Sequence, residues 1–328
     1  MALALYYKPS YERLRERIHA VAPQLDVALY DEDGRIHYRG QVLAEDALRP
    51  EYFWIHLDLF KSARLADYFR LMQQAPTATW LHTINTGLDQ LPYLPLLDKG
   101  MLLTNNHAQA IAIAEYVLAQ VLCHYQDLAD FRLKQEQQLW KPRGFREING
   151  TRWLLVGFGH IGQAVAQRVK AFGASVVAVR RGPDDVGLAD RVVTQAQLMQ
   201  ELPEADVVVL ACASNAATHH LVDADFLAAM KPGSVLVNIA RGDLVVENDL
   251  QQALDRGTPE LAVLDVFEQE PLPPGAWPWT HPRVRLTPHT SNAGSGLRAR
   301  SEAIFIENLR RISKGEALLN QVSRRDIL

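Results

Sequence analysis

A glycine-rich turn between a strand pattern and a helix pattern constrains the fold of this chain more than any other feature. The stretch TRWLLVGFGHIGQAVAQRVKAF reads as an apolar strand, the turn GFGHIG and a helix. In such a turn the first glycine permits the tight reversal, the second lets backbone approach a pyrophosphate, and the third lets helix and strand pack closely. The N–H groups at the helix start bind phosphate oxygens. The motif therefore predicts a dinucleotide site formed by Gly157, Gly159, His160, Ile161 and Gly162.

Strand and helix patterns alternate on both sides of this turn. The runs ADVVVLACA, GSVLVNIA and LAVLDVF follow it, with helical segments between them. The runs AVAPQLDVALYDE, YFWIHLDL and TATWLHTINTG precede it, and a long helix, or two joined end to end, is expected from Asn105 to Trp140. Continuous apolar strands suit parallel sheets covered on both faces. Because 328 residues exceed the ~250 that one core usually supports, we expect an α/β protein with two doubly wound parallel sheets.

Composition and charge exclude several classes of protein. The chain has 34 basic and 38 acidic residues and a net charge of −4. It therefore lacks the excess of positive charge that binds nucleic acid non-specifically. It contains no apolar run of the ~20 residues that a membrane span requires. Two cysteines are too few for a disulfide framework, and the adjacent His219 and His220 lack partners at metal-ligand spacing. We expect a cytoplasmic protein with no metal site and no membrane or nucleic-acid partner.

The second strand of the dinucleotide unit indicates which cofactor binds. In NAD-binding proteins an acidic residue about 20 residues after the turn hydrogen-bonds the ribose. Here Arg180 and Arg181 stand near that place. Guanidinium groups can pair with a 2′-phosphate, which a carboxylate would repel. The sequence therefore favours NADP(H), with NAD as the alternative.

Polar residues follow the later apolar strands. Arg241 comes in LVNIARGDLV, Asp265 and Glu270 in LDVFEQEPLPP, and His289 in VRLTPHTSNAG. In open α/β sheets ligands bind beyond the carboxyl ends of the strands, so these side chains are candidates for chemistry. Reduction of a carbonyl needs a proton donor and a fixed cation beside the oxygen, which a histidine and an arginine can supply.

The order of these motifs resembles the D-isomer-specific 2-hydroxyacid dehydrogenase family. The similarity runs from TGLD at residues 86–89 through NHAQAIAIAEYVLAQVL, GFGHIG, NIARG and LDVFEQEPLP to TPH. One departure is Ala213, in a loop near the cofactor, where relatives often carry proline. The resemblance implies a Rossmann cofactor domain over residues 103–288, inserted in a flavodoxin-like substrate domain made of residues 1–102 and 289–328.

The resemblance also implies a role for each candidate residue. His289 would be the general acid, and Glu270 would hydrogen-bond it and favour its imidazolium form. Arg241 would bind the carboxylate and carbonyl oxygen of a 2-oxo acid, and backbone N–H groups around Thr86 and Gly87 would receive the carboxylate. Asp265 would lie near the nicotinamide carboxamide, and Ala240 would join the cofactor-binding set.

Within the family, the arginine after the second strand and the segment Trp140-Lys141-Pro142 are most similar to glyoxylate/hydroxypyruvate reductases. The resemblance implies a small 2-oxo acid substrate and a homodimer formed through the cofactor domain. Trp140 would reach the neighbouring subunit's substrate pocket or would simply pack. Two alternatives stay open: a cofactor-sensing interaction protein on the same fold, and an NAD-dependent phosphoglycerate-type dehydrogenase.

Overall fold

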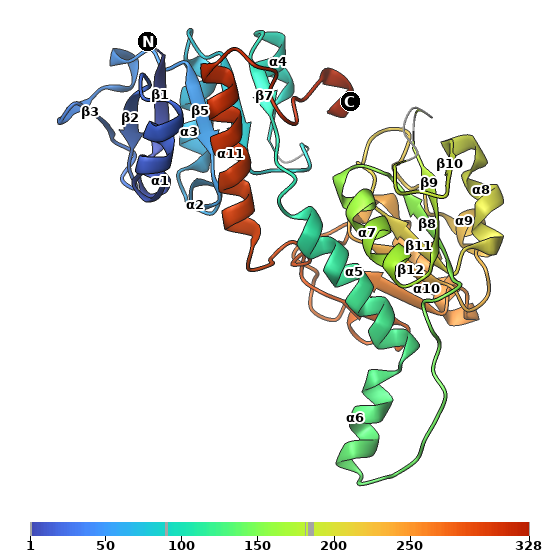
Figure 1. The fold of residues 1–328 in the computed structure, drawn as a ribbon. Coiled ribbons are helices and arrows are strands. Elements are labelled where there is room, and N and C mark those ends of the chain that lie inside the picture. Colours follow the sequence, from blue (N-terminus) through green and yellow to red (C-terminus); the bar gives the residue numbers. More distant parts are fainter. Residues whose placement is uncertain (1, 89–90, 181, 183–186, 328) are drawn as a thin grey trace. The chain divides into compact units, whose positions relative to one another are not determined.

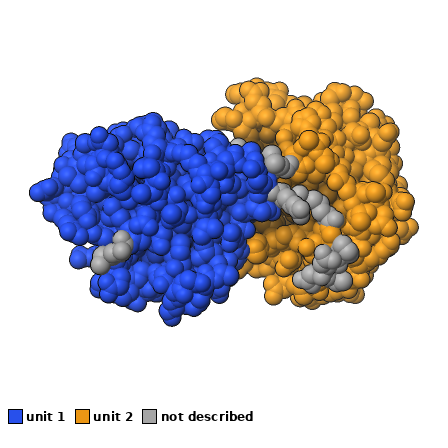
Figure 2. All heavy atoms as spheres, turned by 90° about the horizontal axis from the view of Figure 1, so that it is seen from above, with its two compact units in different colours: residues 1–108, 295–328 blue, residues 109–294 orange. Residues whose placement is uncertain are grey.

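The chain forms two compact units, one of which is an insertion in the other. The computed structural model describes residues 2–88, 91–180, 182 and 187–327. Unit 1 comprises residues 1–108 and 295–328, and unit 2 comprises residues 109–294 (Figure 2). The chain leaves unit 1 after residue 108 and returns to it after residue 294. Both boundaries lie six residues beyond the expected ones, which followed residues 102 and 288. His289 therefore lies within unit 2.

Unit 1 is built on a seven-stranded sheet in the order β4-β3-β2-β1-β5-β6-β7 (Figure 1). Its five parallel strands, β2-β1-β5-β6-β7, have the 2-1-3-4-5 order of flavodoxin-like sheets. The hairpin of β3 and β4 extends one edge with antiparallel pairing. The strands are β1 (Leu3–Tyr7), β2 (Asp26–Tyr30), β3 (Ile36–Tyr38), β4 (Gln41–Leu43), β5 (Tyr52–Ile55), β6 (Trp80–Thr83) and β7 (Leu102–Thr104). The helices are α1 (Lys8–Val21), α2 (Leu57–Phe60), α3 (Leu65–Gln74), α4 (Leu94–Asp98) and α11 (Leu297–Ser313).

Unit 2 has a seven-stranded parallel sheet in the order β10-β9-β8-β11-β12-β13-β14. This is the 3-2-1-4-5-6 Rossmann order with one further strand, so the expected α/β class and the Rossmann fold are confirmed. The strands are β8 (Arg152–Val156), β9 (Ser175–Val179), β10 (Arg191–Val193), β11 (Val207–Leu210), β12 (Val235–Asn238), β13 (Leu261–Leu264) and β14 (Val284–Leu286). The helices are α5 (Ala110–Tyr125), α6 (Leu128–Glu136), α7 (His160–Ala171), α8 (Leu198–Glu201), α9 (Ala224–Ala229) and α10 (Glu247–Arg256). Short 3-10 turns cover Glu45–Ala47, Gln195–Gln197, Leu202–Glu204, Gly242–Leu244, Trp277–Trp279 and Arg324–Asp326.

Burial of apolar side chains explains why the two units are separate. In the described part of the chain, four clusters of buried apolar side chains form, and each contains residues of one unit alone. The strands β8, β11, β12 and β13 are buried almost throughout, as sheets covered on both faces require. No helix among the described residues is long and apolar enough to cross a membrane. The cytoplasmic location stays a prediction.

The segment after α5 extends away from the sheet of unit 2 (Figure 1). Of the two expectations for residues 105–140, a long helix or two joined end to end, the second is found, because Asp127 takes a left-handed conformation (φ 51°) between α5 and α6. None of the α6 residues is buried. We call residues 127–147 the arm, and its exposed apolar side chains are Leu128, Phe131, Leu133, Leu139, Trp140 and Phe145.

Two histidines of unit 1 are fully buried and should make its stability depend on pH. His56 and His82 are 0% exposed, and burial lowers the pKa of His56 to about 4 and that of His82 to about 3. The unfolded chain, with an ordinary histidine pKa of 6.5, therefore binds protons below pH 6.5 that the folded chain does not. Stability is complete above pH 6.5 and falls as the pH drops toward 4.

We expect a loss of about 2 kcal/mol per buried histidine between pH 7 and pH 5, at about 1.4 kcal/mol per pH unit below 6.5. Urea unfolding followed by tryptophan fluorescence at the two pH values measures it. His82→Gln should reduce the difference, whereas replacing the exposed His19 by Gln should leave it as in the wild type. Equal urea midpoints at pH 7 and pH 5 would contradict this expectation.

Candidate active site

The carboxyl end of β12 fixes the position of Arg241. Asn238, the last residue of the strand, donates from Nδ2 to the carbonyl oxygen of Arg241 at 2.8 Å and accepts from the N–H of Ala240 at 3.1 Å. The next residue, Gly242, lies against the main chain of the following loop. A Cβ there would be 1.9 Å from the carbonyl carbon of Phe267, so only glycine fits. Arg241 is therefore held between the end of β12 and the segment that leads to Glu270.

His289 and Glu270 form a direct pair. His289 Nδ1 lies 2.7 Å from Glu270 Oε2, and both side chains are about one-third exposed. The other carboxylate oxygen of Glu270 accepts from the N–H of Phe267 at 3.1 Å. Because a carboxylate only accepts hydrogen bonds, Nδ1 carries a proton, and Nε2 faces away from Glu270 as the atom that could serve a substrate. Such a pair can hold a proton beside a reacting oxygen.

Asp265 anchors the loop that carries His289. Its carboxylate is 0% exposed and accepts from Thr287 Oγ1 at 2.5 Å, from the N–H of Thr290 at 2.8 Å and from the N–H of Ser291 at 3.0 Å. Its carbonyl oxygen accepts from the N–H of His289 at 2.8 Å, and His289 has a left-handed backbone (φ 48°). These bonds fix the main chain from which the imidazole projects, and Glu270 then holds the ring itself. The contact of Asp265 with the nicotinamide stays a prediction.

The glycine turn has the shape that a pyrophosphate needs. Gly157 has φ +101°, and a Cβ there would lie 2.5 Å from the carbonyl oxygen of Ala211. A Cβ on Gly162 would lie 2.4 Å from the carbonyl oxygen of Gly157. Gly159 precedes α7, which begins at His160 and directs its first N–H groups toward the turn. N–H donors converge on this cradle, and a Cβ at Gly159 would meet no protein atom within 4 Å, so the backbone there is open to a ligand and the residues present fit a dinucleotide. The loop in which Ala213 replaces proline starts beside the turn.

Of the two arginines expected to select the cofactor, the structure describes one. Arg180 directly follows β9, its N–H donates to the carbonyl oxygen of Val193, and its side chain is half-buried. The carboxyl end of β9 is adjacent to that of β8, which leads into the glycine turn. Arg181 lies outside the described residues.

The loop of Thr86 and Gly87, whose N–H groups are expected to receive the substrate carboxylate, belongs to unit 1. Thr86 follows β6, and its Oγ1 donates to the carbonyl oxygen of Asn106 at 2.5 Å. The amide of Asn105 donates to the carbonyl oxygen of Thr86 at 3.1 Å. These bonds fix the loop of Thr86 and Gly87, whereas Asp89 lies outside the described residues.

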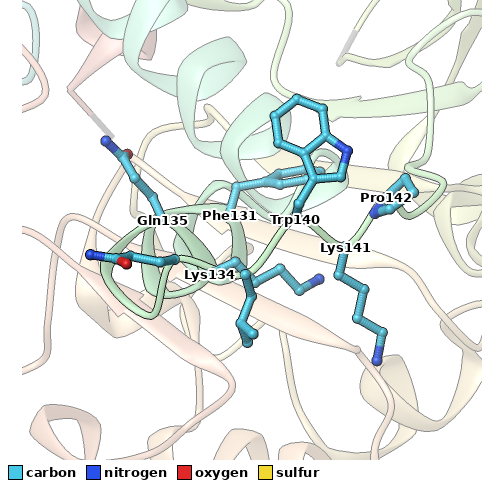
Figure 3. Close-up of a pocket in the computed structure, with 8 residues that line it drawn as sticks. Phe131, Lys134, Gln135, Trp140, Lys141 and Pro142 are labelled. Carbon is cyan, nitrogen blue, oxygen red and sulfur yellow. The ribbon is translucent and has the colours of Figure 1, made fainter.

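Trp140 lies on the arm, where its side chain is 99% exposed. With Phe131, Leu139 and Pro142 it lines a shallow hollow on the arm (Figure 3). The hollow is separate from the strand ends that carry Arg241, Glu270 and His289.

Two positioning residues escaped the sequence interpretation. Asn238 holds Arg241, and Thr287 binds both Asp265 and, at 2.8 Å, the hydroxyl of Tyr116. A signal for Asn238 was present, since an amide at the end of an apolar strand run is unusual. Thr287 lies in the motif TPH, but nothing in the sequence assigned it a role.

The described residues contain no cluster of three or more side chains with metal-binding potential. His219 and His220 have ring centroids 3.8 Å apart, and Nε2 of His220 lies 3.5 Å from Glu268. This is a solvent-side pair on a loop, half-exposed at His220.

Comparison with known proteins gives one family. A family model described as D-isomer specific 2-hydroxyacid dehydrogenase, NAD binding domain, matches residues 118–291. Glyoxylate/hydroxypyruvate reductase A of Serratia proteamaculans is 33% identical over 199 residues, which are 61% of each chain. The protein of the same name from Photorhabdus laumondii is 32% identical over 226 residues, which are 69% of each chain. The alignment thus spans less than two thirds of the Serratia relative and slightly more than two thirds of the Photorhabdus relative.

Solved structures of similar fold cover nearly the whole chain. A D-isomer specific 2-hydroxyacid dehydrogenase family protein from Aeromonas salmonicida has a TM-score of 0.78 at 29% identity, over 98% of this chain and 99% of that one. A dehydrogenase of the same description from Xanthobacter autotrophicus, solved with NADPH and MES, has a TM-score of 0.76 at 27% identity, over 99% of both chains.

Proposed function

Because the chain belongs to the D-isomer-specific 2-hydroxyacid dehydrogenase family, we propose that it reduces a small 2-oxo acid to the D-2-hydroxy acid with NADPH. The observation that carries the proposal is the His289–Glu270 pair, at 2.7 Å, in the unit that also holds the glycine cradle. Glyoxylate and hydroxypyruvate are the first candidates, because the relatives from Serratia and Photorhabdus bear those substrates in their names.

The residues of this chain supply binding, orientation and a proton. Bound NADPH supplies the hydride. Arg241 binds the carboxylate and carbonyl oxygen of the substrate, and its positive charge stabilises the oxygen as negative charge develops there. His289 donates a proton from Nε2 to that oxygen, while Glu270 holds the ring through Nδ1. The N–H groups around Thr86 and Gly87 bind the substrate carboxylate.

The cofactor would be held by the glycine turn and α7. Gly157, Gly159, His160, Ile161 and Gly162 would hold the pyrophosphate, and the buried Ala240 and Asp265 would hold the nicotinamide end. Arg180 would pair with the 2′-phosphate, and Arg181, which lies outside the described residues, is proposed for the same role. The NADPH-bound Xanthobacter structure supports a phosphorylated cofactor for this fold.

The test of the function is a kinetic panel of 2-oxo acids with both reduced cofactors, followed by the fall in absorbance of the reduced nicotinamide. We expect turnover of glyoxylate or hydroxypyruvate and a higher kcat/KM with NADPH. Arg180→Ser should lower kcat/KM for NADPH by about 10-fold or more, the value of one charge-assisted hydrogen bond, and leave NADH little changed. Arg256→Ser, at an exposed arginine of α10, is the control.

Two results would contradict this proposal. Absence of turnover over the whole panel would favour a cofactor-sensing interaction protein. A clear preference for NADH would overturn the role of Arg180.

We also propose that the chain forms a homodimer through unit 2, with the arm as the contact. Six apolar side chains of the arm are exposed, which is unusual for a helix and loop facing water. Burying them against a second copy would remove them from solvent, and Trp140 would then contact the partner.

The dimer predicts the effect of a charge placed on the arm. Leu133→Asp should convert the dimer into a monomer in sedimentation equilibrium, because a buried unpaired carboxylate opposes association. Val42→Asp, at an apolar residue of unit 1 that is similarly exposed, should leave the dimer intact. A monomeric wild type at micromolar concentration would contradict the proposal.

A further inference from the structure

We propose that Asn106 is a positioning residue of the reaction, which fixes the loop of Thr86 and Gly87 by connecting it to α11. The proposal rests on the proposed function, because it is there that this loop binds the substrate carboxylate. Asn106 lies between β7 and the point where the chain leaves unit 1, and it is 1% exposed.

The main chain of Asn106 binds the loop directly. Its carbonyl oxygen accepts from Thr86 Oγ1 at 2.5 Å, and its N–H donates to the carbonyl oxygen of Asn85 at 3.3 Å. Two consecutive loop residues are therefore tied to one buried residue. A displacement of Asn106 must move the N–H groups that follow Asn85.

The side chain of Asn106 connects this position to the rest of unit 1. Its Nδ2 donates to Ser301 Oγ at 3.0 Å, on α11, and lies 3.3 Å from His82 Nε2. Its Oδ1 accepts from the N–H of Ala108 at 2.8 Å. Both amide hydrogens, the side-chain oxygen and both main-chain groups thus have partners.

The protonation of His82 fits this arrangement. Burial lowers its pKa to about 3, so the ring is neutral and one nitrogen must accept. Thr104 Oγ1 lies 2.8 Å from His82 Nδ1 and 3.0 Å from Trp80 Nε1, and its own proton can reach the carbonyl oxygen of Leu81 at 3.4 Å. Asn106 Nδ2 can only donate, so His82 Nε2 accepts from it, and Nδ1–H then donates to Thr104 Oγ1.

Such a network matters for rate because substrate geometry is set by fractions of an ångström. Removing the Asn106 amide leaves His82 Nε2 and the Ala108 N–H buried without their partner. The segment around residue 106, after β7, can then shift to satisfy them. A displacement of about 1 Å at a binding group can cost a large factor in rate. The expected effect is on binding of the 2-oxo acid, since the glycine cradle belongs to the other unit.

The test compares Asn106→Ala with Asn308→Ala. Asn308 is also fully buried in unit 1, and its amide binds the main chain of Leu319 through Nδ2 and Oδ1 at 3.0 and 2.7 Å, with no bond to the loop of Thr86 among the described contacts. Both variants lose a buried amide and should lose similar stability in urea. We expect KM for glyoxylate to rise about 10-fold or more in Asn106→Ala alone, with a smaller fall in kcat and an unchanged Kd for NADPH.

A gentler pair keeps the proposal testable if Asn106→Ala does not fold. Ser301→Ala removes one partner of Asn106, and Ser313→Ala removes a hydroxyl on the same helix that binds the carbonyl oxygen of Leu309. KM should rise about threefold or more in the first and stay constant in the second.

Amide hydrogen exchange separates failure of the inference from failure of the function. Exchange at residues 84–88 should be faster in Asn106→Ala and Ser301→Ala than in their controls, whether or not the protein turns over any 2-oxo acid. Loss of all turnover in the wild type would refute the proposed function. Equal KM values and equal exchange in the variants and their controls would overturn the positioning role.

Discussion

Replacing His289 should lower kcat by about 10²–10⁴, the usual contribution of a general acid. Without it, the proton for the developing alkoxide must come from water. His289→Asn is the most informative change, since asparagine tolerates the left-handed backbone that His289 adopts (φ 48°). Its amide cannot donate a proton for chemistry. Steady-state kinetics with NADPH and the best 2-oxo acid measure the effect.

The control for His289 is a second histidine–carboxylate pair of the same unit. His281 Nε2 lies 3.3 Å from Asp255 Oδ1, away from the strand ends that carry the site residues. His281→Asn should keep kcat within about twofold of the wild type. Glu270→Gln should give an intermediate loss, because the amide can still accept from Nδ1–H but carries no charge. Nearly normal turnover in His289→Asn would refute its role as the proton donor.

Replacing Arg241 should lower kcat/KM by about 10²–10³, as loss of a donor to a developing oxyanion does. Arg241→Gln removes the charge. Arg241→Lys keeps the charge but cannot form bidentate hydrogen bonds to two adjacent oxygens. We expect the lysine variant to retain more activity than the glutamine variant and still to remain well below the wild type.

The Kd for NADPH separates a substrate role of Arg241 from damage to the site. Fluorescence titration should give the same Kd in the wild type and both variants, because Arg241 is proposed to contact the 2-oxo acid. A higher Kd for NADPH together with a normal kcat would assign Arg241 to the cofactor instead. The hydrogen bond of Asn238 to the carbonyl oxygen of Arg241 involves main chain and should survive either substitution.

The sequence allowed prediction of the unit 2 fold because strand and helix signals there are long and regular. The apolar runs around residues 207–210, 235–238 and 261–264 became β11, β12 and β13, and the glycine turn leads into α7. In unit 1 the first strand, Leu3–Tyr7, was not expected, nor was the hairpin of β3 and β4. The three-residue strands β3 and β4 carry too little periodicity to be recognised, and the five apolar residues of β1 show no alternation that distinguishes a strand from a buried helix segment.

The candidate site was predictable in its residue types but not in its supports. A histidine after proline and a glutamate in a loop can be read from motif order. The saturation of Asp265 by Thr287, Thr290 and Ser291 cannot, because it depends on how a loop folds back onto the end of a strand. The contacts of Asn106 with Ser301 join residues 195 positions apart. Such contacts follow from tertiary packing and leave no local pattern.

The insertion of unit 2 has a consequence for the modularity of the chain. The two segments of unit 1 meet beside the points of departure and return, where Arg300 Nε donates to the carbonyl oxygen of Ala108 at 2.8 Å and the N–H of Asn105 donates to Asn320. The two apolar clusters that cover the sheet of unit 1 contain no side chain from residues 109–294. Unit 2 nevertheless carries Arg241, Glu270 and His289, so an exchange of the inserted unit would replace the cofactor site and the proposed proton donor together and leave only the loop of Thr86 and Gly87 in the host.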